Sequence, residues 1–215
     1  MNDEMRRGYA EAVVQPLPDD LRVVLEDCER RGDIPAIHVD PDVGRLLQLL
    51  VMIHRPRRVV EIGTLVGFST AYLARALPAD GRLITIERDP TFAALARDNL
   101  ARLGLGERVE VRAGDAAEVL DQLGDDPVDL VVIDADKRSY PRYLKWAHGH
   151  LRPGGLLIAD DAFAFGHVLD REIEDDELRA AVIGVRTYNH VVCNSDDFFT
   201  VMLTTAQGLT VSVRR

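Results

Sequence analysis

One stretch decides the fold of this chain: Val59-Val60-Glu61-Ile62-Gly63-Thr64-Leu65-Val66-Gly67-Phe68-Ser69-Thr70. It begins as a short apolar, β-branched run typical of a buried strand and ends in a helical pattern. Between the two lies a turn with glycines at 63 and 67. A glycine adopts backbone angles that are closed to other residues, and it lets the chain pass close to a ligand. A strand, a glycine turn and a helix in this order are typical of an open α/β sheet, where ligands bind beyond the carboxyl ends of the strands.

The same alternation continues along the chain. Further strands are predicted at 83–86, 109–111, 130–133 and 156–159, and helices at 68–77, 91–103, 115–123 and 139–150. Continuous apolar strands joined by helices indicate a parallel sheet covered on both faces. A helix at 174–192 then precedes two more predicted strands, 198–205 and 209–213. The turn between these two is so short that they must form an antiparallel hairpin.

Two helices are predicted ahead of the first strand. One carries an apolar stripe from Leu21 to Cys28 and ends at Gly32, and the other starts near Pro41 and reaches residue 53. No linker rich in Gly, Ser or Pro separates these helices from the rest. We therefore interpret residues 1–215 as a single domain, with a helical cap at 1–55 and an α/β core at 56–215.

Composition and charge exclude several classes of function. The 215 residues are 47% hydrophobic and 29% charged, and no apolar run approaches the roughly 20 residues of a membrane span. The net charge of -10 disfavours nucleic acid as a partner, because a phosphate backbone needs a basic face. The N-terminus lacks the apolar stretch of a signal peptide, and Cys28 and Cys193 have no metal-binding spacing. A cytoplasmic location, without a membrane or nucleic-acid partner, is expected.

A nucleoside site is predicted at the ends of the first three strands. Glu87 ends the second, about twenty residues past the glycine turn, where an acid accepts both hydroxyls of a ribose. The alternative is an acid that caps a strand in solvent. Gly114-Asp115-Ala116 follow the third strand, where an adenine edge would lie; Asp115 either accepts from its amine or caps the next helix. The glycine spacing is not GxGxxG, which disfavours a dinucleotide.

Together these residues resemble the core of the class I S-adenosylmethionine-dependent methyltransferases, with Glu61-Ile62-Gly63-Thr64 and Gly67 as the first motif. More narrowly, residues 39–214 are similar to the cation-dependent O-methyltransferases of the catechol and caffeoyl-coenzyme A type. The motifs that carry this likeness are Ile133-Asp134-Ala135-Asp136-Lys137, Leu151-Arg152-Pro153-Gly154-Gly155, Asp160-Asp161 and the terminal hairpin.

The resemblance implies a three-layer Rossmann-like α/β fold with a seven-stranded, mostly parallel sheet whose last strand is antiparallel. It also implies an S-adenosyl-L-methionine cofactor and a homodimer. The cofactor contacts predicted on this basis are Val39, Glu61, Gly63, Thr64, Gly67, Ser69, Glu87, Arg88, Gly114, Asp115, Ala116 and Asp134.

Three acids are predicted to meet beside this site. Asp134 ends the fourth strand, and Asp160 and Asp161 end the fifth. Like charges at one sheet edge repel one another unless a cation lies between them, and Mg²⁺, with Mn²⁺ or Ca²⁺ as alternatives, suits oxygen ligands. Three acids that cap helices in water are the alternative. The resemblance assigns all three as metal ligands, although the family usually has Asn at the third position, so Asp161 adds a negative charge.

The resemblance also makes Lys137 the general base for an acceptor hydroxyl, against the commoner fate of a surface lysine. A lysine serves near neutral pH only if its pKa falls from about 10.4. The expected reaction is methyl transfer to a catechol-like aromatic small molecule that binds the metal through neighbouring oxygens. The alternatives are a metal-independent methyltransferase acting on another acceptor and a non-catalytic, dimeric S-adenosylmethionine-binding protein.

Several aromatic side chains are candidates for the acceptor pocket. Phe163 and Phe165 follow Asp161 directly and are favoured, whereas aromatics of the predicted helix at 139–150 are more often core residues. His38 could reach the cofactor from the cap. The full candidate set for the pocket wall is Tyr140, Tyr143, Trp146, Phe163, Phe165 and His167.

Overall fold

The computed structural model describes residues 5, 8–9, 12–35, 37–205 and 207–215. The chain divides into two compact units, Met1–Ile37 and His38–Arg215. The first contains helix α2 (Asp19–Arg31), which ends at Gly32 in the left-handed conformation. The division lies well before residue 55, where the cap was expected to end. Helix α3 (Pro41–His54) belongs to the second unit because it packs against α4 (Phe68–Ala76), and Gly44 of α3 is in contact with the Tyr72 ring.

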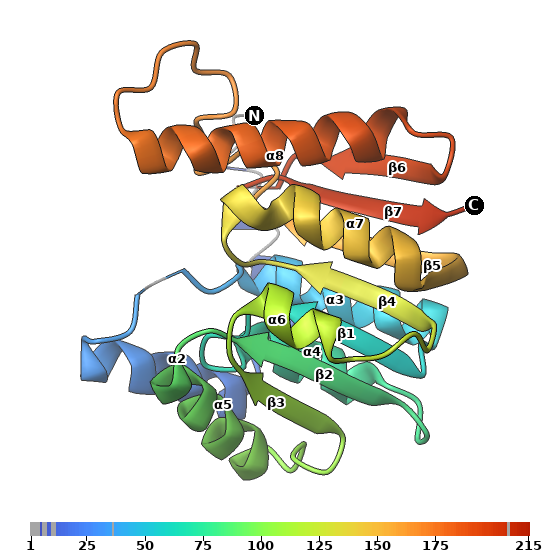
Figure 1. Ribbon diagram of the computed structural model, residues 1–215. Coiled ribbons are helices and arrows are strands. Elements are labelled where there is room, and N and C mark those ends of the chain that lie inside the picture. The colour runs from blue at the N-terminus through green and yellow to red at the C-terminus, as the bar shows by residue number, and fades with distance from the viewer. Residues whose placement is uncertain (1–4, 6–7, 10–11, 36, 206) are drawn as a thin grey trace. The chain divides into compact units, whose positions relative to one another are not determined.

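Within the described residues, seven strands form one sheet in the second unit, in the order β3-β2-β1-β4-β5-β7-β6 (Figure 1). Their bounds are β1 Arg58–Ile62, β2 Arg82–Glu87, β3 Val109–Ala113, β4 Val128–Ile133, β5 Leu151–Asp160, β6 Phe198–Leu203 and β7 Leu209–Arg214. Strands β1 to β5 pair in parallel, while β7 is antiparallel to both β5 and β6. The predicted fold class is confirmed. The strand order reverses between β1 and β4, so a crevice is expected outside their carboxyl ends.

Strand β5 is longer than predicted. It begins at Leu151, whereas the strand was predicted at 156–159, so the motif at 151–155 forms the first half of the strand. Leu151 pairs with Val128, and the register then shifts before Leu130 pairs with Leu156. This irregularity absorbs the extra residues, and beyond it the strand is buried as far as Asp160.

Helices cover both faces of the sheet. The face toward the viewer in Figure 1 carries α6 (Ala116–Asp121), α7 (Tyr140–His150) and α8 (Asp176–Asn194), whereas α3 and α4 lie behind the sheet. Helix α5 (Pro90–Arg102) contacts β2 and β3. Val60 and Ile133 pack with Leu144 and Val185 in one core cluster. Because both faces are covered, the central strands β4 and β5 carry continuous apolar runs at 130–133 and 156–159.

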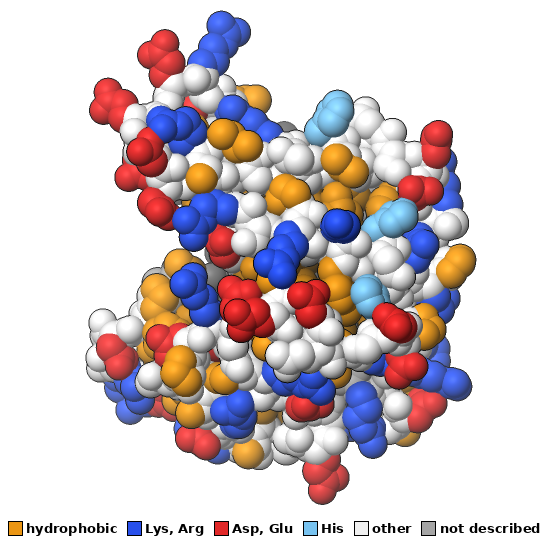
Figure 2. All heavy atoms as spheres, in the orientation of Figure 1, with side chains coloured by type: hydrophobic (Ala, Val, Ile, Leu, Met, Phe, Trp, Pro, Cys, Tyr) orange, Lys and Arg blue, Asp and Glu red, His pale blue; other side chains and the backbone are white. Residues whose placement is uncertain are grey.

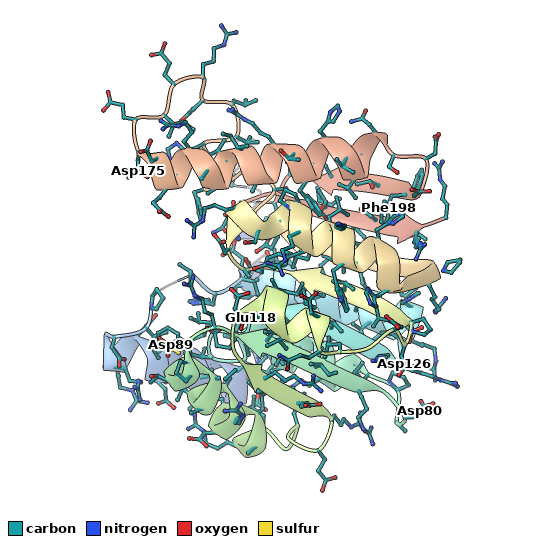
Figure 3. The ribbon with its side chains drawn as sticks, viewed as in Figure 1. Asp80, Asp89, Glu118, Asp126, Asp175 and Phe198 are labelled. Carbon is teal, nitrogen blue, oxygen red and sulfur yellow. The ribbon has the colours of Figure 1, made fainter. Side chains whose placement is uncertain are left out.

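The carboxyl ends and the amino ends of the parallel strands lead into different loops and helices. Asp89 is the N-cap of α5, which follows β2, and Glu118 lies in the first turn of α6, which follows β3. Figure 3 shows both on one side of the sheet. Asp80 and Asp126, in the loops that lead into β2 and β4, lie on the opposite side. The predicted ligand site lies on the side of the carboxyl ends.

Over α6, α7 and α8 the charged side chains of both signs are interspersed (Figure 2). Among the described residues of this face, basic side chains do not form a continuous area. No helix in the described part of the chain combines the length and the apolar character needed to cross a membrane.

Candidate active site

The glycine turn lies directly against the strand end that carries Asp134. Gly63 has φ +100°, and a Cβ there would overlap the Asp134 carbonyl oxygen and lie 2.7 Å from its carbonyl carbon. The Asp134 amide donates to Ile62 O at 2.8 Å, and the Gly63 amide to Ile86 O at 3.0 Å. Only glycine leaves room for this backbone crossing. The glycine turn is therefore in direct contact with the strand end that carries Asp134 of the predicted acidic cluster.

The Glu87 carboxylate binds the backbone of the same turn. Its Oε2 accepts from Leu65 N at 2.7 Å and Thr64 N at 3.3 Å, while Oε1 accepts from Asp89 N at 2.9 Å. Leu65 itself is in the left-handed region, with φ +49°. The predicted ribose acceptor and the glycine turn thus lie together at the ends of β1 and β2.

Glu61 is a buried scaffold beneath the turn. Its carboxylate accepts from Ser69 Oγ at 2.7 Å and from Thr70 Oγ1 and Thr85 Oγ1, both at 2.6 Å. Burial raises the pKa of Glu61 to about 7, although these three hydroxyl donors oppose the shift. Thr64 joins the same network through a 2.5 Å bond to Thr85. Two predicted cofactor residues, Glu61 and Ser69, are therefore hydrogen-bonded to each other and tie β1 to α4.

The other predicted cofactor residues lie around this turn. Gly67, with φ +85°, is the N-cap of α4. Gly114 follows β3, and its amide donates to the Glu87 carbonyl at 2.8 Å. Asp115 caps α6 by accepting from Ala117 N and Glu118 N, so the capping alternative holds for its side chain. Of the remaining predicted cofactor residues, Val39 and Ala116 are buried and Arg88 is exposed. The His38 ring meets Phe68 edge-on, with ring centroids 5.5 Å apart.

Lys137 lies between two of the three predicted acids. Its Nζ donates to Asp134 Oδ1 at 2.9 Å and is 3.7 Å from Asp161 Oδ2. It is 6% exposed and is the first residue of the 3₁₀ turn η1 (Lys137–Ser139), which leaves β4. Asp161 has φ +54°, and its Oδ1 accepts from Phe165 N at 2.8 Å. Two of the three acids expected to converge at the strand ends, Asp134 and Asp161, thus meet at Lys137.

The pKa values at this edge are shifted by burial and by neighbouring charge. Burial, followed by the charge of Asp134, raises the pKa of Asp160 to about 7, and burial also raises the pKa of Asp161. For Lys137, burial favours the neutral amine, but Tyr140 and Asp134 outweigh it and its pKa ends above the ordinary value. In this arrangement the pKa of Lys137 is thus raised, whereas a general base requires a lowered pKa.

The carboxylates have the chemistry of a site for a hard cation. Two buried oxygens, Asp160 Oδ1 and Asp161 Oδ2, accept no hydrogen bond within the part of the chain that the structure describes. Oxygens of this kind are the ligands of Mg²⁺ and Ca²⁺. Among the described residues, however, no three acidic, His or Cys side chains form a group with the spacing of a metal site. The donor set fits a cation, but the Lys137 ammonium holds Asp134 in the present arrangement.

The aromatic candidates separate into core and site. Tyr140 and Tyr143 are buried in the core, and Trp146 packs against it and donates to Leu120 O at 3.2 Å. Phe165 is 57% exposed, and its ring centroid is 5.7 Å from Lys137 Nζ. Phe165 is thus a candidate whose aromatic ring is exposed and lies close to the Lys137 amine. His167 instead bonds Asp170 at 2.7 Å.

Asn189 and Gly208 hold the loop after β5, and neither is among the predicted site residues. Ala164 and Phe165 both have positive φ, at +50° and +57°. Asn189 of α8 donates to Ala162 O at 2.8 Å. At Gly208, in the β6–β7 turn, a Cβ would lie 2.9 Å from the Phe163 ring. Gly208 was visible in the sequence as a hairpin glycine, but nothing in the local pattern ties Asn189 to this loop.

Comparison with known proteins places this geometry in a family. The model of the O-methyltransferase family matches residues 12–215. The chain belongs to the O-methyltransferase family. Among curated proteins, a catechol O-methyltransferase of Niastella koreensis is 42% identical over 174 residues, which cover 80% of this chain and 77% of the relative.

Solved structures agree with this assignment. An O-methyltransferase from Bacillus cereus in complex with SAH is 35% identical, with a TM-score of 0.89 and coverage of 97% of this chain and 96% of the other. A putative caffeoyl-CoA O-methyltransferase from Staphylococcus aureus is 25% identical, with a TM-score of 0.83, covering 99% and 98%. The expected family is confirmed: the chain is an O-methyltransferase, and it is similar to proteins named as catechol and caffeoyl-CoA O-methyltransferases and to a family member solved with SAH.

Proposed function

We propose that this O-methyltransferase transfers the methyl group of S-adenosylmethionine to a hydroxyl of a catechol-like aromatic small molecule, with the help of a divalent cation. One observation carries the proposal. The Lys137–Asp134 pair lies at 2.9 Å on the strand end whose backbone crosses the glycine turn at Gly63. A cofactor bound on that turn therefore lies beside charged groups that can act on an acceptor hydroxyl.

The cofactor is expected to bind along the ends of β1, β2 and β3. Glu87 would accept the ribose hydroxyls, which requires its carboxylate to exchange at least part of its bonding to Thr64 and Leu65. Gly63 and Gly67 keep the turn free of side chains, so the backbone comes close to the ligand. The Glu61 network holds this turn in place before the cofactor arrives, and such preorganisation lowers the cost of binding.

Asp134, Asp160 and Asp161 would hold the cation. A divalent ion there supplies Lewis acidity, which lowers the pKa of a bound hydroxyl. Mg²⁺ is the expected ion, with Mn²⁺ or Ca²⁺ as alternatives. Asp160 Oδ1 and Asp161 Oδ2, which accept no hydrogen bond from any described residue, support this assignment.

Lys137 has two possible roles that follow from its charge. As an ammonium ion it stabilises the oxyanion of the acceptor by a charge-assisted hydrogen bond. As a free amine it takes the hydroxyl proton, and this requires other positive charge to offset the carboxylates that raise its pKa. In both roles Lys137 keeps the acceptor oxygen beside the methyl group, and alignment of this kind supplies much of a rate enhancement.

The acceptor is expected to lie against Phe165, whose exposed ring faces the lysine. An aromatic acceptor would pack against this ring in an offset or edge-to-face arrangement. The catechol activity of the Niastella koreensis relative supports neighbouring oxygens on the acceptor. A homodimer and a cytoplasmic location stay predictions.

One observation favours a metal-independent variant of this reaction as the second candidate. The Lys137 ammonium already bridges Asp134 and Asp161, at 2.9 Å and 3.7 Å, so the protein supplies a cation of its own. In this variant Asp161 acts as an ion-pair partner of Lys137 instead of a metal ligand.

Methyl transfer from labelled S-adenosylmethionine to a catechol panel tests the proposal, with Mg²⁺ and with excess EDTA. We expect turnover with Mg²⁺, a loss of about 10²-fold or more in EDTA, and a similar loss in Asp134→Ala, because the cation loses its site. Asp126→Ala, on the opposite edge of the sheet, is the control and should keep full activity. Unaltered turnover in EDTA would favour the metal-independent variant, and no transfer to any catechol would refute the acceptor class.

A further inference from the structure

Helix α8 presents one face to the short turn that carries Lys137. Glu177, Gly184 and Tyr188 are seven and four positions apart, a spacing that places them on the same side of a helix. Each lies against a residue of η1 or of the first turn of α7. In Figure 1, α8 runs alongside α7. The catalytic turn is therefore backed by a helix that starts some 40 residues later in the chain.

Gly184 makes the closest of these contacts. A Cβ at this position would overlap the Lys137 carbonyl oxygen and lie 2.9 Å from Arg138 Cα and 3.0 Å from the Lys137 carbonyl carbon. Glycine inside a helix costs about 1 kcal/mol relative to alanine, so its presence here has a reason outside the helix. That reason is the backbone of Lys137, which lies where any side chain would be.

The other two contacts hold the turn on either side. Glu177 forms an ion pair with Arg138 at 2.9 Å. The Tyr188 ring meets Tyr140 edge-on, with centroids 5.6 Å apart. Tyr140 in turn donates to the Asp160 carbonyl at 2.9 Å, and its ring centroid is 5.1 Å from Lys137 Nζ. A turn of three residues in the 3₁₀ conformation has little stability of its own, so these packing contacts determine its position.

We propose that Gly184 is a positioning residue for methyl transfer: its missing side chain lets α8 fix the backbone of Lys137 so that Nζ lies between Asp134 and Asp161. The functional half of this inference rests on the role proposed for Lys137. Its structural half does not, because the position of the amine can be observed without turnover. A side chain at residue 184 would push η1 away from α8 and move the amine relative to both carboxylates.

The sequence makes a direct test possible, because Lys137 and Lys145 are its only lysines. Protein labelled with ¹³C at lysine Cε gives one resonance for each. In Gly184→Ala we expect the Lys137 resonance to move while that of Lys145, exposed on α7, stays in place. We also expect kcat to fall by about 10²-fold with the KM for S-adenosylmethionine within about twofold, because a displacement near 1 Å costs that much in rate.

Two variants serve as matched controls. Gly149→Ala is also a glycine-to-alanine change within a helix, but no described residue lies within 4 Å of the added Cβ, so it should leave both resonances and kcat unchanged. Val192→Ala removes a fully buried side chain from α8 away from the lysine turn, and it should lower the melting temperature without moving the Lys137 resonance. It shows what loss of stability alone does to kcat.

The outcomes separate this inference from the proposed function. A Lys137 resonance that stays in place in Gly184→Ala, or a fall in kcat no larger than in Val192→Ala, overturns the inference. If wild-type protein methylates no catechol, the proposed function fails while the resonance still decides the structural half. If Gly184→Ala does not fold, Tyr188→Leu removes the ring contact to Tyr140 instead. An unmoved Lys137 resonance in that variant also overturns the inference.

Discussion

Glu61 illustrates how one buried residue supports a site without facing the reaction. Its carboxylate accepts three hydroxyl hydrogen bonds, from Ser69, Thr70 and Thr85, which join β1, α4 and β2. These donors offset part of the cost of burial, but the pKa still rises to about 7. A polar network of this kind in a low-dielectric interior strongly favours one geometry, here that of the glycine turn.

The raised pKa of Glu61 predicts how stability depends on pH. A carboxyl that binds its proton more tightly in the folded state stabilises the fold fully below its unfolded pKa, and this contribution disappears as pH rises through about 7. We expect the free energy of unfolding to fall by about 1–3 kcal/mol between pH 4.5 and pH 7.5 from this group.

Thermal unfolding followed by circular dichroism across this pH range measures the effect. Glu61→Gln keeps the shape and carries no charge, so its slope against pH should be smaller than that of the wild type. The slope that remains belongs in part to Asp160, whose pKa burial and Asp134 also raise to about 7. Identical slopes in the two proteins would contradict the prediction.

At the scale of elements, the turn between β1 and α4 joins the two halves of the site. Gly63 crosses the Asp134 backbone so closely that the glycine turn and the strand end that carries Asp134 are in direct contact. The crossing lies at the point where the strand order reverses, between β1 and β4. Displacement of this turn would therefore alter both the cofactor site and the acid–lysine pair.

Gly63→Ala should cost stability for two separate reasons. A positive φ costs a residue with a Cβ about 1–2 kcal/mol, and the overlap with Asp134 adds about 1–3 kcal/mol. Gly124→Ala isolates the first of these, because Gly124 has φ +71° and nothing within 4 Å of an added Cβ. Urea denaturation should show the larger loss in Gly63→Ala, and calorimetry should show weaker S-adenosylhomocysteine binding in that variant alone. Equal losses in the two variants would refute the close crossing.

For the whole molecule, the cofactor site predicts a linkage between ligand and stability. A ligand that binds only the folded protein stabilises it by about 2.7 kcal/mol at one hundred times its dissociation constant. For a chain of this size that corresponds to a rise of about 5–10 °C in melting temperature. We expect this rise with S-adenosylhomocysteine and none with NAD, since the glycine spacing does not suit a pyrophosphate. A rise with NAD alone would contradict the cofactor assignment.

Much of the fold could be predicted because its signals are local. The apolar runs at 59–62 and 130–133 identify buried strands, and the glycines at 63 and 67 identify the turn between strand and helix. The parallel arrangement follows, since helices between apolar strands leave few other topologies. The division at residues 37 and 38 could not be predicted in this way, because the packing of α3 on α4 leaves no local mark.

The sequence by itself determined which groups reach the carboxyl edge of the sheet: the glycine turn, Glu87, and the acids at the ends of β4 and β5. The strand pattern and the parallel pairing that it predicts are enough for that. Only the tertiary structure decided what those groups do to one another. Lys137 and Gly184 are 47 positions apart, yet their contact sets where the amine lies, and the amine meets Asp134 at 2.9 Å. Hydrogen bonds and pKa values depend on separations of an ångström or less, and these are fixed by the packing of distant segments rather than by any local pattern.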